Sequence, residues 1–407
     1  MQTRMRRLIP LVLSVSFLSA CADHPHGVME PVLGDIVGTN RVKVLVATTR
    51  SADKSQAVMF NGFRAEAMAF ADVEVSLPPD RLRKVGDVQW PKTLPGNPST
   101  DFVTRRAVII DQKTALALVH EQVKHTRKKQ VLVFVHGFNN RFEDAVYRFA
   151  QIVHDSGTDA VPVLFTWPSK ASVLAYGYDR ESSTYSRNQL EAVLKGLAAD
   201  PQVGEVSILA HSMGNWLLLE SLRQMAIRDG RIAPKIKNVL LAAPDVDIDV
   251  ARTQIADMGP LKPNFALFVS RADKALELSK NIWGSEARLG AINPMAEPYH
   301  SMLVKDRIAV YDLTALNSPG GMNHATFASS PEIVELIGSR LAAGQTVAES
   351  NQRFSDTLFM GASGTVSKFG DAAGLVVSAP TAAIDSDARD NYRERAHQLS
   401  GNIFGGN

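Results

Sequence analysis

The sequence of 407 residues contains a single cysteine, so no disulfide can form within one chain. Basic residues exceed acidic residues by only two, because 44 lysines and arginines stand against 42 aspartates and glutamates. This balance differs from that of nucleic-acid-binding proteins, and we expect no nucleic-acid partner. The apolar stretch over residues 8–20 is too short to span a bilayer, which takes about 20 residues. Hydrophobic residues nevertheless make up 45% of the chain, ample for one large core.

The apolar stretch at the start of the chain has the features of an export signal. Three arginines precede it, and it ends in Leu18-Ser19-Ala20-Cys21. This ending resembles the lipobox of bacterial lipoproteins, which implies cleavage before Cys21 and lipidation of its sulfur. The alternative is an ordinary signal peptide with an incidental cysteine. Ala22 rather than aspartate follows the cysteine, which in Gram-negative cells points to the outer membrane, facing the periplasm. We therefore expect a lipid-anchored protein of the cell envelope.

Strands and helices are predicted to alternate between residues 130 and 343. The predicted strands are apolar runs of the kind that is buried in parallel sheets, namely 131–135, 161–167, 206–210, 239–243, 265–269 and 307–311. Parallel strands need helical crossovers, so this order predicts an α/β fold with a doubly wound, mostly parallel sheet and helices on both faces. Two earlier runs, Val42–Ala47 and Val73–Leu77, are expected to add partly antiparallel strands.

The chain divides into four predicted parts. A lipoprotein signal peptide covers 1–20, a linker covers 21–40, and the α/β domain covers 41–343. The stretch 344–407 is rich in small and polar residues without a sustained apolar period, so we expect a poorly ordered C-terminal tail. Within the α/β domain, the segments 168–182 and 284–305 are too long for tight turns and are expected near the mouth of a site.

The pentapeptide Ala210-His211-Ser212-Met213-Gly214 lies between a predicted buried strand and a predicted helix. A serine on such a sharp turn has its hydroxyl held out at the carboxyl edge of the sheet, as in a nucleophile elbow. The turn brings strand and helix close together, so the positions two before and two after the serine must be small. Gly214 meets this requirement, and Ala210 adds one methyl group. The pattern therefore indicates Ser212 as a catalytic nucleophile.

A serine nucleophile needs a base and an acid that orients the base. Asp273 follows the predicted strand 265–269, and His324 follows the predicted strand 307–311. Because the carboxyl ends of neighbouring parallel strands share one crevice, these side chains are expected to converge with Ser212. Asp245 also follows a strand and is the alternative acid. We favour Asp273, because Asp245 begins an Asp-x-Asp-x-Asp run suited to capping the next helix.

The oxyanion of an acyl-transfer reaction needs hydrogen-bond donors. The backbone amides of Phe138, just beyond the strand 131–135, and of Met213, next to the nucleophile, are the predicted donors. Two histidines nearby are predicted to be structural. His136 is expected to brace the loop as a neutral imidazole, and His211 to be a packed neighbour of the site.

Five motifs together resemble a bacterial α/β-hydrolase family of unknown function, described loosely as esterase/lipase-like. They are His136-Gly137-Phe138-Asn139-Asn140, Phe165-x-Trp167-Pro168-Ser169, Tyr178-Asp179-Arg180-Glu181-Ser182, Ala210-His211-Ser212-Met213-Gly214 and Ala243-Pro244-Asp245-Val246-Asp247. The similarity runs from about Val42 to Leu341. It implies a serine hydrolase with the triad Ser212, Asp273 and His324, and it implies little about the substrate.

Two sequence patterns are similar to metal-binding motifs, but their residue spacing does not fit a metal site. His120 and His125 are five residues apart, which puts them on different faces of a helix. The run of Asp245, Asp247 and Asp249 lacks the glycine and glutamate of a calcium loop. No metal and no cofactor are therefore expected.

The sequence thus predicts a membrane-tethered serine hydrolase acting on small-molecule carboxylic esters. Amide or thioester hydrolysis is an alternative within the same class. A non-catalytic envelope lipoprotein that uses the hydrolase fold as a binding module is the alternative from another class.

Overall fold

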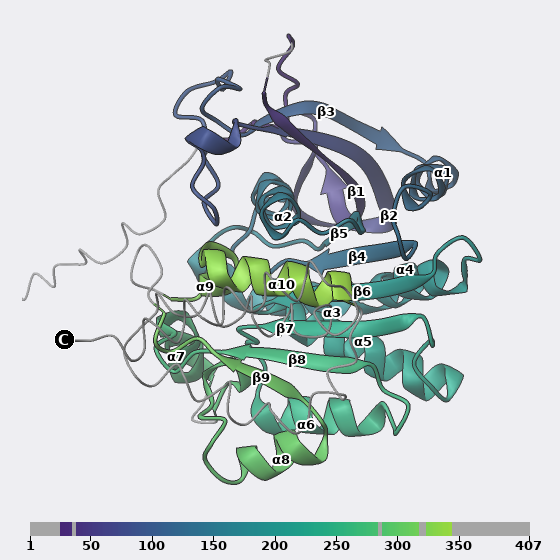
Figure 1. Cartoon of the computed structure of the whole chain (residues 1–407), viewed down its shortest axis with the longest axis vertical. Helices are drawn as coiled ribbons and strands as arrows, with labels where there is room; N and C mark the ends of the chain where they lie inside the picture. Colours follow the sequence, from purple (N-terminus) through teal and green to yellow (C-terminus); the bar gives the residue numbers. More distant parts are fainter. Residues whose placement is uncertain (1–24, 35–37, 284–286, 317–322, 344–407) are drawn as a thin grey trace, which may run out of the picture.

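A computed structural model describes residues 25–34, 38–283, 287–316 and 323–343 of the chain (Figure 1). Its centre is a nine-stranded sheet in the order β3-β2-β1-β5-β4-β6-β7-β8-β9. The strands are β1 (Asn40–Ala52), β2 (Phe60–Leu77), β3 (Val103–Ile110), β4 (Gln130–Val135), β5 (Val161–Thr166), β6 (Glu205–His211), β7 (Ile236–Ala242), β8 (Asn264–Val269) and β9 (Ala309–Asp312). Strand β2 runs antiparallel to β1 and β3, and the other neighbours are parallel.

Helices lie between the successive strands from β3 to β9, and further helices follow β9. They are α1 (Gln112–Val123), α2 (Phe142–Ser156), α3 (Tyr176–Tyr185), α4 (Arg187–Ala199), α5 (Gly214–Asp229), α6 (Ile248–Asp257), α7 (Lys274–Trp283), α8 (Tyr299–Lys305), α9 (Thr326–Ser329) and α10 (Pro331–Ala343), with short 3-10 turns η1 (Asp80–Leu82), η2 (Val173–Ala175) and η3 (Leu289–Ala291). The predicted fold class is therefore confirmed as an α/β-hydrolase fold, a mixed and mostly parallel sheet with helices on both faces. Among the described residues, no helix combines the length and the apolar character needed to cross a membrane.

Two cores lie on opposite faces of the sheet, because successive side chains of a strand point to opposite sides. In β4, Val131, Val133 and Val135 pack with α4, α5 and α6, whereas Leu132 and Phe134 pack with α2 and α10. This burial on both faces explains the unbroken apolar runs of the parallel strands.

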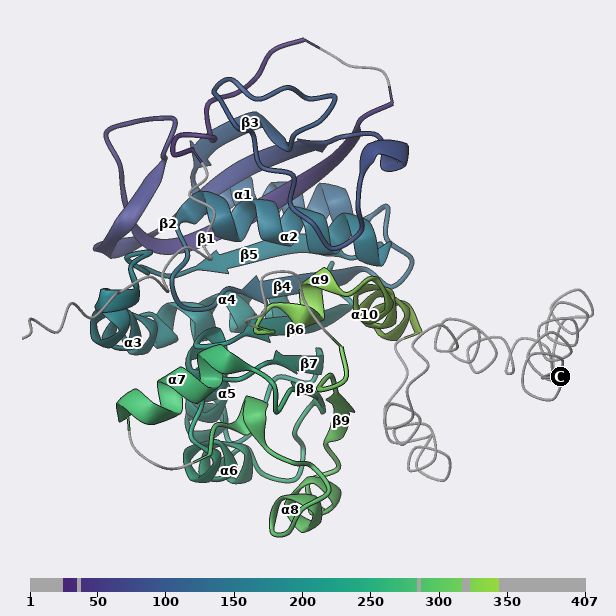
Figure 2. The ribbon, with the colours of Figure 1, turned by 90° about the vertical axis from the view of Figure 1, so that its left-hand side faces the viewer.

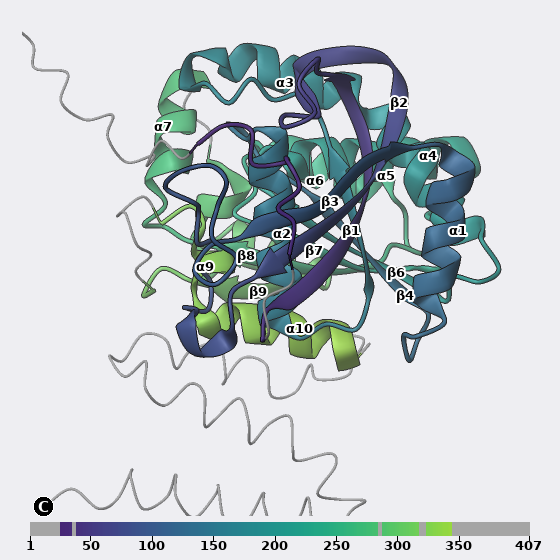
Figure 3. The same ribbon diagram turned by 90° about the horizontal axis from the view of Figure 1, so that it is seen from above.

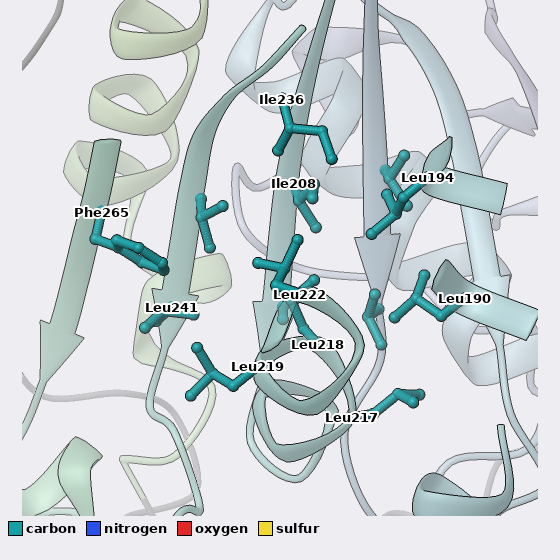
Figure 4. Packing of buried hydrophobic residues seen from close by; sticks show 14 of the residues in the cluster. Leu190, Leu194, Ile208, Leu217, Leu218, Leu219, Leu222, Ile236, Leu241 and Phe265 are labelled. Carbon is teal, nitrogen blue, oxygen red and sulfur yellow. The ribbon is translucent and has the colours of Figure 1, made fainter. Parts of the chain in front are cut away.

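Helix α5 is the centre of one of these cores. Figure 4 shows four of its leucines packed against side chains of the sheet and of α4, namely Leu217, Leu218, Leu219 and Leu222. Each fully buried leucine contributes about 1.5–3 kcal/mol through the water-exposed surface that it removes. The helix that follows Ser212 is therefore firmly fixed to the sheet.

The carboxyl ends of the parallel strands meet at one edge of the molecule. Figures 2 and 3 show α3, α7 and the turn between β1 and β2 on that side. Part of the segment 168–182, expected from the sequence to lie near the mouth of a site, is helical, because it contains η2 and most of α3. The loops that follow β4, β6, β8 and β9 at this edge carry the predicted site residues.

Candidate active site

Ser212 lies on the turn between β6 and α5 with a backbone φ of +54°. This left-handed region is strained for a residue with a side chain, at a cost of about 1–3 kcal/mol. Neighbouring groups hold the turn in place. Ser212 N donates to Ala242 O at 3.0 Å, and Ser212 O accepts from the backbone amides of Asn215 at 3.1 Å and Asp245 at 3.2 Å. The strained serine is thus held by β7, by the loop that follows β7 and by the first turn of α5, as in a nucleophile elbow.

The glycine two residues after Ser212 allows helix α5 to approach strand β4. A Cβ atom on Gly214 would lie 2.4 Å from His136 O and 2.7 Å from Val135 O, both of which are backbone atoms. Gly137 makes a similar approach from the other side, because its Cβ would lie 2.7 Å from Ser212 Cβ. The loop after β4 is therefore pressed against the serine.

The two predicted oxyanion donors flank this contact. Phe138 follows Gly137, and Met213 follows Ser212 directly, just before the first turn of α5. Within the described residues, the backbone amides of Phe138 and Met213 donate no hydrogen bond. Two free amides beside a strained serine provide donors for a developing negative charge.

The loop that carries Phe138 is held by a buried arginine of β1. Arg50 is only 1% exposed, and its guanidinium donates to Asn140 O at 2.8 Å, Ser169 O at 3.1 Å and Thr166 Oγ1 at 2.8 Å. Burial lowers the pKa of Arg50 to about 10, against the opposing effect of Glu143 and smaller effects of Asp179 and Asp144. The arginine thus remains charged near neutral pH and ties the ends of β4 and β5 together.

His136 supports the same loop, as predicted for a structural histidine. Its ring stacks on Trp167 at 4.9 Å, and its Nε2 accepts from Trp167 N at 3.1 Å. Burial, with the nearby charge of Arg50, holds the pKa of His136 well below its ordinary value. The neutral ring therefore carries its proton on Nδ1, which donates to Gly137 O at 2.8 Å.

Asp179 of α3 completes the support from the opposite side. The fully buried carboxylate accepts from Ser169 Oγ at 2.5 Å and Lys170 N at 2.8 Å, and it also receives the backbone amide of Asn139. Burial raises the pKa of Asp179, and these hydrogen bonds act in the opposite direction. Arg50 and Asp179 were not predicted from the sequence as site residues. Asp179 lies within one of the five family-like motifs, and the only signal for Arg50 is a charged residue at the end of an apolar strand.

His324 and Asp273 come together at the same edge of the sheet. Asp273 lies between β8 and α7, and its Oδ2 is 2.7 Å from His324 Nδ1. Its Oδ1 accepts from the backbone amides of Ala275 and Leu276, each at 3.0 Å. The aspartate therefore orients the imidazole with one oxygen and caps the first turn of α7 with the other.

The charge of Asp273 also sets the protonation of His324. Burial alone would lower the pKa of the imidazole, but the charge and the hydrogen bond of Asp273 outweigh it, with a smaller contribution from Asp245. The pKa of His324 is therefore raised above its ordinary value. With Nδ1–H directed at the carboxylate, Nε2 is the nitrogen that remains for proton transfer.

His211 links the elbow to the loop of His324. Its Nε2 donates to His324 O at 3.1 Å, and its ring centroid lies 4.8 Å from that of His324. Burial keeps the pKa of His211 well below its ordinary value, with the neighbouring His324 acting in the same direction. These contacts are those of the packed neighbour that was predicted. In the part of the chain that the structure describes, no hydrogen bond joins Ser212 Oγ to His324, and in unliganded enzymes such bonds are often long.

The expectation that Asp245 caps the next helix is wrong. Asp247 takes that role, because its Oδ1 accepts from the amides of Asp249 at 3.0 Å and Val250 at 3.2 Å. The carboxylate of Asp245 instead accepts from Tyr176 Oη at 2.6 Å and Ser279 Oγ at 2.7 Å. It also pairs with buried Arg288, whose Nε lies 3.4 Å away. This network joins α3, α7 and the elbow, and Asp245 makes no hydrogen bond to His324.

The other predictions concern the lipidation site, the C-terminal tail and metal binding. Cys21, the predicted lipidation site, and the tail 344–407 lie outside the described residues. Among the residues that the structure does describe, no three His, Cys, Asp or Glu side chains are grouped so that they could hold a metal ion. The chemistry available at this edge is that of Ser212, the His324–Asp273 pair and backbone amides.

The chain is similar to known proteins in sequence and, weakly, in structure. A relative from Nostoc sp. (strain PCC 7120), the uncharacterized protein alr1448, is 24% identical over 170 residues, which cover 35% of this chain and 44% of that protein. The chain thus spans less than half the length of this relative. Weak similarity to solved structures concerns the fold alone. A "predicted CIB-like hydrolase" from Thermoplasma acidophilum is 13% identical over 58% of this chain and 91% of its own, with a TM-score of 0.31.

A fungal esterase from Rhizomucor miehei is 12% identical over 77% of this chain and 85% of its own, with a TM-score of 0.32. The sequence pattern of a family described as "Alpha/beta hydrolase of unknown function (DUF900)" matches residues 111–340, more than half of the chain. The strand order, the turn at Ser212 and this match together lead to one assignment. The chain belongs to the DUF900 family of α/β hydrolases of unknown function.

Proposed function

We propose that the protein is a membrane-tethered serine hydrolase that cleaves carboxylic esters through an acyl-enzyme intermediate. The observation that carries the proposal is the strained backbone of Ser212, at φ +54° between β6 and α5. Strain of this kind persists where the surrounding structure enforces it, and it is frequent at catalytic residues. The His324–Asp273 pair and the amides of Phe138 and Met213 supply the other groups that an acyl transfer needs.

The proposed reaction has two halves. His324 Nε2 takes the proton of Ser212 Oγ as the oxygen attacks the carbonyl carbon of the ester. The carbonyl oxygen gains a negative charge, which the two amides stabilise. The intermediate then collapses, the bond to the alcohol oxygen breaks, and the alcohol leaves with the proton held by His324. Water, deprotonated by the same imidazole, attacks the acyl-enzyme, releasing the acid and restoring Ser212.

Labelling with a fluorophosphonate probe tests the nucleophile. Wild-type protein should react covalently, and Ser212→Ala should neither react nor hydrolyse esters, because losing a catalytic serine costs about 10⁶-fold in turnover. Ser207→Ala is a matched control, since Ser207 lies on the same strand and its Oγ accepts from Gln130 and Asn238 instead. Labelling or hydrolysis that persists in Ser212→Ala would contradict the assignment.

The same experiment separates the alternatives. A binding module that merely keeps the fold would not react with the probe, even as wild type. Amide or thioester hydrolysis would still give labelling, because the nucleophile is shared. Rates on esters, thioesters and amides of the same acyl group, with graded chain length, then distinguish the substrate class.

The membrane tether depends on Cys21. Only a cysteine sulfur accepts the lipid at a lipobox, so Cys21→Ser should leave an unlipidated precursor. Growth with an alkyne-bearing fatty acid measures this directly. Equal incorporation into wild type and Cys21→Ser would exclude lipidation at this residue.

A further inference from the structure

The beginning of the described chain lies at the edge of the molecule that carries the active-site loops. His26 Nδ1 is 3.5 Å from Glu143 Oε1, and Glu143 is in the first turn of α2. Helix α2 begins directly after the loop of Phe138, at the carboxyl end of β4. Met29 N donates to Ala57 O at 3.0 Å, in the turn between β1 and β2. The chain thus enters the domain beside the candidate active site.

The proposed lipid anchor is close to this entry point. Cys21 precedes His26 by five residues. An extended chain spans at most about 3.6 Å per residue, so the anchored sulfur stays within about 18 Å of His26. A domain of this size is roughly 50 Å across. A lipid attached to Cys21 therefore holds the carboxyl edge of the sheet, rather than the opposite edge, next to the membrane.

The same edge exposes apolar side chains, which we call the apolar rim: Phe63, Val173 and Leu174. They are 61%, 47% and 99% exposed, respectively. The two segments that carry them are in contact, because a Cβ atom on Gly62 would lie 2.8 Å from Ser169 O. Exposed apolar side chains of this kind commonly mark a binding surface when they are grouped.

Basic side chains accompany the apolar rim. The ammonium of Lys170 lies 3.1 Å from the ring centroid of Phe63, and the guanidinium of Arg64 lies 4.8 Å from that of Tyr178. Apolar side chains beside lysine and arginine match the interface of a bilayer with anionic headgroups. This chemistry, together with the short tether, favours a lipid surface over a protein partner.

Two aromatic side chains, Tyr176 and Phe138, connect the segment of Leu174 to the loop beside the nucleophile. Tyr176 follows η2 directly, and its ring packs on Phe138 at 5.0 Å between centroids. Phe138 follows Gly137, which lies against Ser212. A membrane that contacts Leu174 is therefore adjacent to the wall of the active site.

We propose that the apolar rim rests on an anionic lipid surface and that the substrate is an amphiphilic ester held in that membrane. The inference rests on the lipid anchor and the esterase activity of the proposed function. The active site would then receive acyl chains directly from the bilayer. Water-soluble short-chain esters would react without help from the apolar rim.

Fluorescence quenching tests the docking independently of activity. Leu174→Trp and Ile227→Trp are made in the lipidated full-length protein, which is reconstituted into vesicles of phosphatidylcholine and phosphatidylglycerol with brominated acyl chains. Ile227 is a matched control, because it is 60% exposed but lies near the far end of α5. The added fluorescence of Leu174→Trp should be quenched more strongly. Equal quenching of the two variants, or stronger quenching of Ile227→Trp, would overturn the docking surface.

Activity on two substrates tests the consequence for catalysis. Leu174→Asp should lower hydrolysis of a long-chain ester held in the same vesicles by about tenfold or more, since the carboxylate loses apolar burial and is repelled by anionic lipid. Hydrolysis of a soluble short-chain ester should stay within about twofold, and Ile227→Asp should change neither rate. Equal losses on both esters would refute the membrane role of Leu174. If wild type hydrolyses neither ester, the esterase proposal fails, while the quenching result still decides the docking.

Discussion

Replacing Asp273 by asparagine separates the two roles of this side chain. In the wild type, Oδ2 lies 2.7 Å from His324 Nδ1, and Oδ1 accepts from the amides of Ala275 and Leu276. Asparagine keeps an oxygen for the amides but offers an NH₂ group in place of the second oxygen. The imidazole would then turn its unprotonated nitrogen toward the amide and carry its proton on Nε2. That nitrogen could no longer take the proton of Ser212.

The expected losses of turnover and of stability in Asp273→Asn follow from these contacts. A wrong histidine tautomer in a trypsin-type triad lowers turnover by about 10⁴-fold, equivalent to about 5.4 kcal/mol of transition-state stabilisation. Asparagine and aspartate cap helices about equally well, so the free energy of unfolding should fall by less than about 1 kcal/mol. Asp273→Ala is the comparison. It loses the cap of α7 as well and should cost about 1 kcal/mol more in stability.

Two measurements on the same preparations check the prediction. Turnover of a short-chain ester gives the catalytic loss, and denaturant unfolding gives the change in stability. Asp273→Asn with more than about a tenth of wild-type turnover would refute the role of Asp273 in orienting His324. Loss of several kcal/mol in stability would instead indicate that the carboxylate matters mainly for folding.

Three further changes test other parts of the site. Asp245→Asn removes the charge partner of Arg288, which is 5% exposed. Denaturant titration should show a free energy of unfolding lower by about 3 kcal/mol, and turnover should fall less than in Asp273→Asn. His324 must be neutral to act as the base, and its pKa is raised above 6.5, so hydrolysis by the wild type should decline as the pH falls through that raised pKa. In Asp273→Asn the raising charge is gone, so a pH profile of hydrolysis should show the decline at lower pH. Gly214→Ala places a Cβ 2.4 Å from His136 O, so thermal unfolding should reveal a loss of about 2 kcal/mol or more, with a large fall in turnover; unchanged stability would contradict the close approach.

Most of the parallel part of the sheet was predictable from the sequence because strands β4–β8 lie inside the sheet and are largely buried on both faces. Such strands form unbroken apolar runs, and all six predicted runs correspond to strands β4–β9. Strand β3 was not predicted. It lies at the edge of the sheet and carries Arg105 and Arg106, so only part of its surface is buried and its apolar pattern is weak.

The proximity of Asp273 to His324 was predictable from strand order alone, because the loops after neighbouring parallel strands share one edge. The contacts of Asp245 and Asp247 could not be predicted from strand order. Both aspartates follow β7, and only the path of the backbone decides which one faces the amides of α6 and which one faces Arg288. A sequence also does not show which charged side chains are buried, and for this reason Arg50 was not predicted as a residue that supports the site.

The position of Arg50 has a consequence for dividing the chain into parts. The family match begins at residue 111, after β1, β2 and β3. A protein shortened to start there would retain Ser212, Asp273 and His324 and all the residues that match the family. It would nevertheless lack the guanidinium that binds Asn140 O, and it would expose the edge of β5 that pairs with β1. Such a shortened protein would keep the side chains of the candidate site but lose the contacts of Arg50 that hold the loop beside them, so the candidate site depends on a strand that lies outside the family match.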